Sequence, residues 1–171
     1  MAVFIIKKQG NFTLKGMLDY LRNMERHHNK IAFYDCFGVN PMNPAEGMMM
    51  TKLLMNQTQG RQYRHLVLSI SDWESQEKNI RKLCIASVAM ANYIFTTEKC
   101  QVAWAVHTNT SHYHAHFVLN SVRYSDGTRV NFSFIDLLRY KLKASVCLSN
   151  VNLESVRYSE YERRYLEEHF A

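Results

Sequence analysis

Short runs of apolar, β-branched and aromatic residues, separated by polar turns, indicate β-strands along much of the chain. The runs that fit this pattern cover Ala2–Ile6, Ile31–Phe37, Tyr63–Ile70, Val102–Val106 and His114–Arg123. Asp126-Gly127, after the last run, is a strong hairpin turn signal, and Arg129–Asn131 is the expected returning strand. The polar stretch Arg26–Lys30 is predicted to be a loop.

Between these runs, apolar residues recur at helical spacing. Behind Thr13, a favourable N-cap, one apolar stripe is formed by Leu14, Met17, Leu18 and Leu21. Further helices are predicted from Pro44 toward Gln57, from Trp73 to Tyr93 behind Asp72, from Asn131 or Ser133 to Val146, and over the charged tail Leu153–Phe170. The buried face of the long helix is expected to carry Ile80, Leu83, Cys84, Ser87 and Val88.

Strands that alternate with helices and close with tight turns favour antiparallel pairing. We therefore expect an α+β fold, a two-layer sandwich in which helices pack on a central antiparallel sheet of about five strands. The length of 171 residues fits one domain spanning residues 1–171.

The charge balance points to a polyanionic partner. Lys and Arg number 21 against 15 Asp and Glu, which gives a net charge of +6 and favours nucleic acid. The four cysteines form no CxxC pair, so we expect reduced thiols rather than a zinc ribbon or redox motif. Neither a long apolar run nor a signal peptide is recognisable, so we expect a cytoplasmic protein that does not insert into membranes.

Four histidines fall within ten residues: His107, His112, His114 and His116. His114 and His116 are two apart in one strand and so face the same side, while His107 ends the preceding strand. If the six residues between His107 and His114 connect antiparallel neighbours, these three imidazoles converge. His112 lies in the connection, where it could touch substrate. A solvated polar face is the alternative interpretation.

Three neutral imidazoles suit a divalent ion such as Mn²⁺, Co²⁺, Ni²⁺ or Zn²⁺ and leave coordination positions open. The sequence has no HExxH motif of zincin proteases and no deaminase signature. In a basic protein, a site of this kind favours metal-assisted phosphoryl chemistry.

At this point the sequence resembles a known family. The run from His107 through Asn109, His114 and His116 to Asn120 resembles the metal motif of conjugative relaxases, mobilisation nucleases of the His-hydrophobic-His (HUH) endonuclease superfamily. Leu18-Asp-Tyr-Leu21 is similar to their tyrosine motif, and Tyr63–Ser69 is similar to their second motif. The order and spacing agree over residues 1–150 and are closest to the P-type relaxases with one catalytic tyrosine.

The resemblance implies that Tyr20 nicks single-stranded DNA at an origin of transfer and becomes joined to its 5′ phosphate. It implies a divalent metal held by His107, His114 and His116, with Mn²⁺ or Mg²⁺ expected and Zn²⁺, Co²⁺ or Ni²⁺ possible in crystals. One departure stands out, because Asn109 occupies the position where the family usually has aspartate. An amide can orient a ligand histidine but raises its basicity less than a carboxylate does.

Further residues are assigned to metal support or DNA contact. They are Asn109, Asn120, His65, Ser69, Arg22 and Arg123, with Arg61, Arg64 and Arg129 as weaker candidates for phosphate contacts. Trp73 could stack on an unpaired base, whereas Trp104 is expected in the core.

Three alternatives remain open at this point. The first is a rolling-circle replication initiator or transposase of the same superfamily, which would use a downstream tyrosine such as Tyr140, Tyr158, Tyr161 or Tyr165. The second is a DNA-binding module with a structural metal, and the third is a metal-dependent enzyme for small molecules. A relaxase would also imply a bacterial host, accessory DNA-binding and coupling proteins, and a further domain in a longer protein.

Overall fold

The computed structural model describes residues 1–8, 12–22 and 31–170. Five antiparallel strands form one sheet in the order β1-β3-β5-β4-β2. The strands are β1 (Val3–Lys7), β2 (Ile31–Phe37), β3 (Tyr63–Ser69), β4 (Val102–His107) and β5 (His114–Asn120). The helices are α1 (Leu14–Arg22), α2 (Pro44–Leu54), α3 (Glu77–Glu98), α4 (Phe134–Ser149) and α5 (Glu160–Phe170). The predicted α+β fold on an antiparallel sheet is confirmed.

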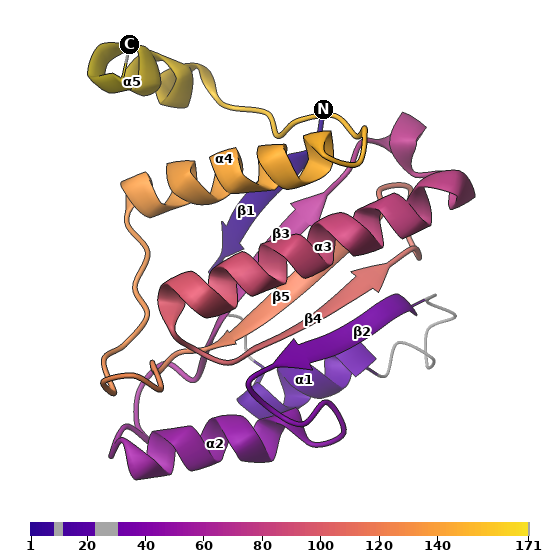
Figure 1. Cartoon of the computed structure of the whole chain (residues 1–171). Coiled ribbons are helices and arrows are strands. Elements are labelled where there is room, and N and C mark those ends of the chain that lie inside the picture. The colour runs from indigo at the N-terminus through magenta and orange to yellow at the C-terminus, as the bar shows by residue number, and fades with distance from the viewer. Residues whose placement is uncertain (9–11, 23–30, 171) are drawn as a thin grey trace.

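The main core lies between the sheet and the helices α3 and α4, which run across one face of the sheet (Figure 1). Alternate strand residues point into this layer, as the period of two requires. At most 1% of the surface of each of four large residues in this layer is exposed: Phe4, Leu66, Trp104 and Phe117. Trp104 packs on Phe37 with ring centroids 4.7 Å apart, which confirms its predicted place in the core.

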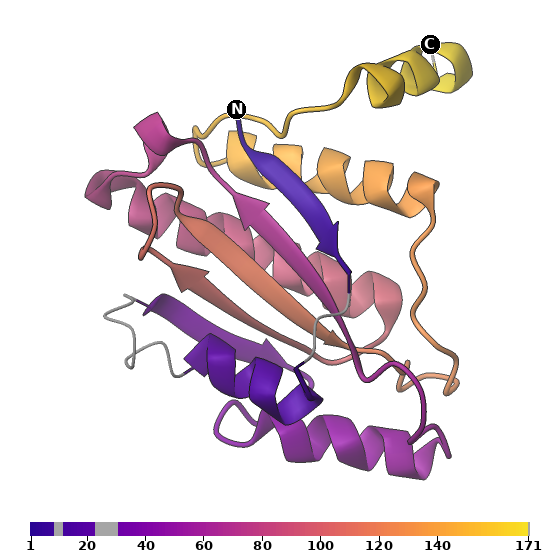
Figure 2. The ribbon, with the colours of Figure 1, turned by 180° about the vertical axis from the view of Figure 1, so that it is seen from behind.

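The opposite face of the sheet is covered only in part. Seen from behind, α1 crosses this face toward the β2 edge, and α2 lies beside α1 (Figure 2). The predicted stripe of α1 packs on Ala103 and Ala105 of β4, whose small side chains allow the helix to approach closely. Thr13 accepts a hydrogen bond from the Gly16 N–H at 3.0 Å, so it caps α1 as expected. The helix α1 thus adds a partial third layer to the two that the sequence predicted.

Several elements differ from their predicted bounds. Asp72 begins a short 3₁₀ turn, Asp72–Glu74, and the long helix starts only at Glu77. Of its predicted buried face, Leu83 and Ser87 are fully buried, whereas Val88 is exposed. The turn at Asp126-Gly127 forms, with Gly127 at φ +73°, but its returning segment makes only a single bridge, Val122 with Arg129.

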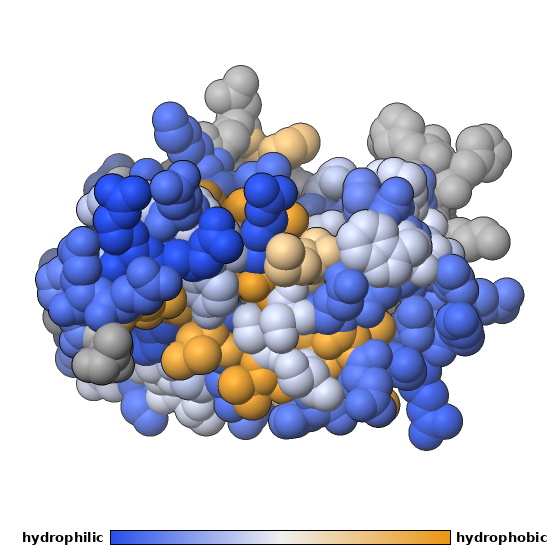
Figure 3. All heavy atoms as spheres, turned by 90° about the horizontal axis from the view of Figure 1, so that it is seen from above, coloured by the Kyte–Doolittle hydropathy of each residue, from blue (hydrophilic) through white to orange (hydrophobic). Residues whose placement is uncertain are grey.

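The C-terminal helix α5 is shorter than predicted, because the chain from Leu153 to Ser159 is not helical. It is linked to α4 by the ion pair of Lys141 with Glu162 at 2.7 Å and encloses an apolar cavity of about 330 Å³ against that helix. Hydrophobic side chains gather among hydrophilic ones at this end of the molecule (Figure 3). No helix in residues 1–8, 12–22 and 31–170 is long and apolar enough to cross a membrane.

A buried carboxylate at the end of α3 binds side chains of α4 and of the segment that follows β5. Glu98, the last residue of α3, is 3% exposed. Its side chain accepts hydrogen bonds from the Tyr140 hydroxyl at 2.5 Å and from Arg123 and Arg139 at 2.9 Å each. Burial, together with the neighbouring Glu98 carboxylate, raises the pKa of Tyr140 well above its usual range. Tyr140 therefore stays protonated and serves as a permanent donor.

We predict that Tyr140→Phe lowers the free energy of unfolding by about 1.5 to 3 kcal/mol, the usual contribution of a hydrogen bond to a charged group. Tyr161→Phe is the matched control: Tyr161 is 66% exposed, and an exposed substitution changes stability by less than about 0.5 kcal/mol. Urea unfolding at constant m-value measures both. Equal midpoints for the two variants would contradict the role given to Glu98.

Candidate metal centre

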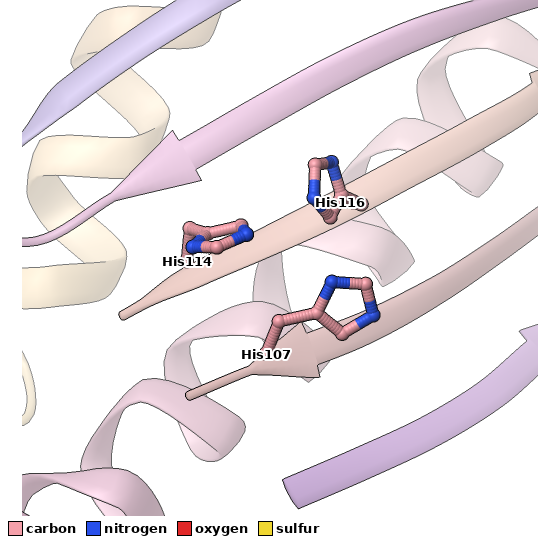
Figure 4. Close-up of side chains that lie close together, drawn as sticks. All are labelled: His107, His114 and His116. Carbon is pink, nitrogen blue, oxygen red and sulfur yellow. The ribbon is translucent and has the colours of Figure 1, made fainter. Parts of the chain in front are cut away.

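The three predicted metal ligands come together at one end of two neighbouring strands. His107 at the end of β4 is directly opposite His114 at the start of β5, and His116 follows on the same face. One ring nitrogen from each residue lies within 4.8 Å of the others. Figure 4 shows the three rings grouped over the same face of these strands. The six-residue connection between the strands makes this convergence possible, as the spacing predicted.

The hydrogen bonds leave one nitrogen of each ring available. His114 Nδ1 donates to the carbonyl of His112 at 2.8 Å, so its Nε2 keeps a lone pair. His107 Nε2 lies 3.5 Å from the Leu21 carbonyl. Within the described part of the chain, His107 Nδ1 and His116 Nε2 are buried and have no hydrogen-bond partner. A buried polar atom without a partner is costly, and a metal ion would satisfy both.

Burial also keeps the rings neutral. It lowers the pKa of His107 to about 4 and that of His116 to about 2, with neighbouring histidines and Lys7 adding to the shift at His116. The pKa of His114 is lowered as well, mainly by burial. Neutral imidazole is the form that binds a metal. Three neutral nitrogen donors, two of them otherwise unsatisfied, therefore fit a divalent transition-metal ion.

Tyr20 lies over this cluster. It belongs to the last turn of α1, and its ring makes edge contacts with His107 and His116, with centroids 6.1 and 5.9 Å apart. Phe12 stacks on the other side of Tyr20 at 6.1 Å. Tyr20 is 36% exposed, so its ring is reachable from solvent. Partial burial raises the pKa of Tyr20, so the phenol is protonated at neutral pH.

His65 supports the cluster from β3. Its Nε2 lies 2.8 Å from His116 Nδ1, the nitrogen opposite the one that faces the other two histidines. Burial lowers the pKa of His65 to about 4, with Lys7 and His107 contributing. A neutral His65 can accept the Nδ1–H of His116, which fixes His116 with its Nε2 lone pair free.

Asn109 and Ser69 lie at the margin of the cluster. The Asn109 side-chain oxygen is buried without a hydrogen-bond partner among the described residues, so no contact to a ligand histidine is seen there. Ser69 pairs with His114 across β3 and β5, and its hydroxyl is 3.5 Å from the Ile70 carbonyl. His112 is exposed and contributes its carbonyl to His114 rather than its ring.

Three other predicted residues lie apart from the cluster. Asn120 is fully buried and donates to the Met48 carbonyl at 3.0 Å and to Gln101 at 2.7 Å. Arg22 donates to the Met42 carbonyl at 2.7 Å. Arg123 is bound to Glu98. Each of these three side chains makes at least one hydrogen bond within the fold.

Some predictions fall elsewhere. Trp73 is 59% exposed in the 3₁₀ turn, and the predicted loop Arg26–Lys30 lies outside the described residues. Sequence reasoning missed Lys7, whose charge contributes to the lowered pKa values of His65, His114 and His116. The signal was present, since Lys7 continues the alternation of Val3 and Ile5 on the histidine face of β1.

Several solved structures share this fold. The relaxase domain of MobM, bound to plasmid pMV158 oriT DNA with manganese, is 16% identical over 92% of this chain and 90% of its own, with a TM-score of 0.61. A second structure of that domain, at another pH, gives 15% identity over 93% and 92%, with a TM-score of 0.59. A structure described as the molecular basis of vancomycin resistance transfer in Staphylococcus aureus gives 11% identity over 76% and 75%, with a TM-score of 0.51.

No curated protein matches the sequence. A family model for relaxases, described as the MobA/VirD2-like nuclease domain, matches residues 20–148. This range begins at the tyrosine over the histidine cluster and includes all three histidines. The match spans most of the chain, so this protein belongs to the family of MobA/VirD2-like relaxase nuclease domains, which are DNA-nicking enzymes.

Proposed function

We propose that this protein nicks single-stranded DNA at a specific site in an origin of transfer. Tyr20 would be the nucleophile, and His107, His114 and His116 would bind a divalent ion. The observation that carries the proposal is the position of the Tyr20 ring, 5.9 and 6.1 Å from two of the three histidine rings. A phosphodiester beside the histidines would then be within reach of the phenol oxygen.

The role of each group follows from its chemistry. The bound ion, with Mn²⁺ or Mg²⁺ the physiological candidates, would stabilise the negative charge that develops on the phosphate in the transition state. The three histidines would hold that ion and leave coordination positions open to substrate. Phe12 and the cluster enclose the Tyr20 ring between them, so its oxygen is positioned before substrate binds.

The reaction is a transesterification. The Tyr20 phenol loses its proton and its oxygen forms a bond to phosphorus, while the bond from phosphorus to the 3′ oxygen breaks. The leaving oxygen takes up a proton and becomes a 3′-hydroxyl, and the 5′ phosphate stays on Tyr20. The strand can later be rejoined by the reverse step, because the phosphotyrosyl bond is itself a phosphodiester.

A rolling-circle initiator or transposase of the same superfamily is the second candidate. It would take its nucleophile from a tyrosine after the histidine motif. Tyr140 is fully buried and bonded to Glu98, and Tyr161 and Tyr165 pack on Phe134 of α4. These tyrosines belong to the α4 side of the sheet, away from the histidines, and this position favours Tyr20.

The family also suggests a biological setting. We propose that residues 1–171 act as one nuclease domain in mobilisation of a bacterial plasmid or conjugative element. The work would take place in the cytoplasm, with accessory DNA-binding and coupling proteins. The net charge of +6 supports a DNA partner.

The first prediction concerns the nucleophile. With Mn²⁺ and single-stranded DNA covering candidate origins, the protein forms a denaturant-resistant DNA adduct that is seen as a shifted band on a denaturing gel. Tyr20→Phe abolishes the adduct, because phenylalanine has no oxygen to attack phosphorus. Tyr165→Phe is the control and keeps it. An adduct that persists in Tyr20→Phe would move the nucleophile to another residue.

The second prediction concerns the metal. Mn²⁺ at about 100 times its dissociation constant should raise the free energy of unfolding by about 2.7 kcal/mol. His114→Ala, which removes a partly exposed ligand, loses most of this stabilisation. His112→Ala retains it, because His112 contributes only its backbone carbonyl. Thermal unfolding with and without Mn²⁺ measures all three proteins, and equal stabilisation of both variants would contradict the proposed ligand set.

The third prediction treats His65 as a positioning residue. His65→Leu removes the acceptor for His116 Nδ1 and should weaken Mn²⁺ binding by about 10- to 100-fold, as is usual when a partner of a ligand is lost. His65→Gln keeps a side-chain acceptor and should recover most of the affinity. Calorimetric titration with Mn²⁺ separates the two variants. Unchanged affinity in His65→Leu would show that His116 needs no such support.

A further inference from the structure

A basic cavity of about 550 Å³ lies where β1 ends and β3 begins, beside the first turn of α4. Four cationic residues contribute to its walls, together with aromatic and aliphatic ones and Ser133, and none of the described lining residues is a carboxylate. The cationic residues are Lys7, Lys8, Arg61 and Arg64. Positive charges gathered around a concave surface attract a polyanion, and they repel one another when no anion is bound.

Three of the four cations have no counter-ion in the part of the chain that the structure describes. Among the described residues, Lys7, Lys8 and Arg61 take part in no ion pair, and all three are exposed. The backbone of Arg61 is nevertheless fixed, because its carbonyl accepts hydrogen bonds from Ser121 at 2.5 Å and from Arg129 at 2.9 Å. These charges are therefore available to a ligand at defined positions.

Arg64 has a different role. Its Nε donates to the Val130 carbonyl at 2.8 Å, another nitrogen binds the Asn131 side chain, and the guanidinium lies 5.6 Å from the centre of the Phe132 ring. Burial and the charge of Arg61 lower the pKa of Arg64. Arg64 thus forms part of the cavity wall and adds to its positive electrostatic potential, while the other three cations remain available to bind phosphate.

Lys7 lies between the cavity, which it lines, and the residues that support the histidine cluster. Lys7 pairs directly with His65 across β1 and β3, and His65 contacts His116. A chain of phosphates entering the metal centre would therefore find its next positive charges at Lys7 and in the cavity.

We propose that this cavity is a phosphate-binding subsite for the same single DNA strand, next to the phosphate that is cut. The inference rests on the proposed function and adds the path of the substrate: past Lys7, around the end of the sheet, and into contact with Lys8 and Arg61. Contacts of this kind bind the sugar–phosphate backbone and fix the position of the strand without reading its sequence.

The test uses a double variant, Lys8→Ala with Arg61→Ala, which leaves Lys7, the histidines and Tyr20 intact. Lys78→Ala with Arg81→Ala is the matched control. It removes the same charge from exposed positions on α3, which does not line the cavity and packs on the face of the sheet opposite the histidine cluster (Figure 1). The probe is a fluorescently labelled oligothymidine, and its binding is followed by anisotropy over a range of salt concentrations.

Each lost phosphate contact to a single strand reduces the slope of log K against log salt by about 0.7. The cavity variant should therefore lose about 1.4 from the slope and bind roughly tenfold or more weakly at low salt, while the control stays near wild type. Mn²⁺ affinity should be unchanged in both variants, which shows that the metal centre is intact.

Two results would overturn the subsite. One is wild-type affinity and slope in the cavity variant, and the other is an equal loss in both double variants, which would reflect net charge alone. In either case the proposed function stands if wild-type protein still forms the Tyr20 adduct. Absence of oligothymidine binding and of any adduct in wild-type protein would instead overturn the proposed function together with the subsite.

Discussion

The register between β4 and β5 is the constraint on which the site depends. Because His107 and His114 are directly opposite each other, side chains from two strands meet at one point, and His116 joins them through the period of two along β5. A shift of one residue would turn two of the three rings to the other face of the sheet. The core fixes this register, since the same shift of β5 would expose Phe117, which is fully buried.

The fold follows from the sequence where a segment is buried on one defined face. Alternation and turn signals predicted β2 with its observed bounds, and the leucine stripe predicted α1, because each reflects local burial. The start of α3 was misplaced, because Asp72 begins a 3₁₀ turn in which the Ser75 N–H donates to the Asp72 carbonyl. An aspartate in this position resembles a helix start in sequence, although α3 itself begins only at Glu77.

The three histidines could be recognised because their spacing alone brings them together. Arg123 and Asn120 could not be placed, since their partners are distant in sequence: Arg123 binds Glu98, and Asn120 reaches the Met48 carbonyl, which is 72 residues away. A polar residue on a strand face can stabilise the fold or bind substrate, and sequence spacing does not distinguish these roles. They are distinguished only by contacts between segments that are remote in sequence.

Small residues on β4 link the fold to the chemistry. Ala103 and Ala105 give α1 room to lie close to the sheet, so that the Leu21 carbonyl comes to 3.5 Å from His107 Nε2. That contact leaves His107 Nδ1 free toward the cluster, and the same helix carries Tyr20 over the rings. The packing of α1 on β4 thus determines both the orientation of the His107 ring and the position of Tyr20. Larger side chains at these two alanines would lift α1 and separate the phenol from the histidines, even with every site residue still present.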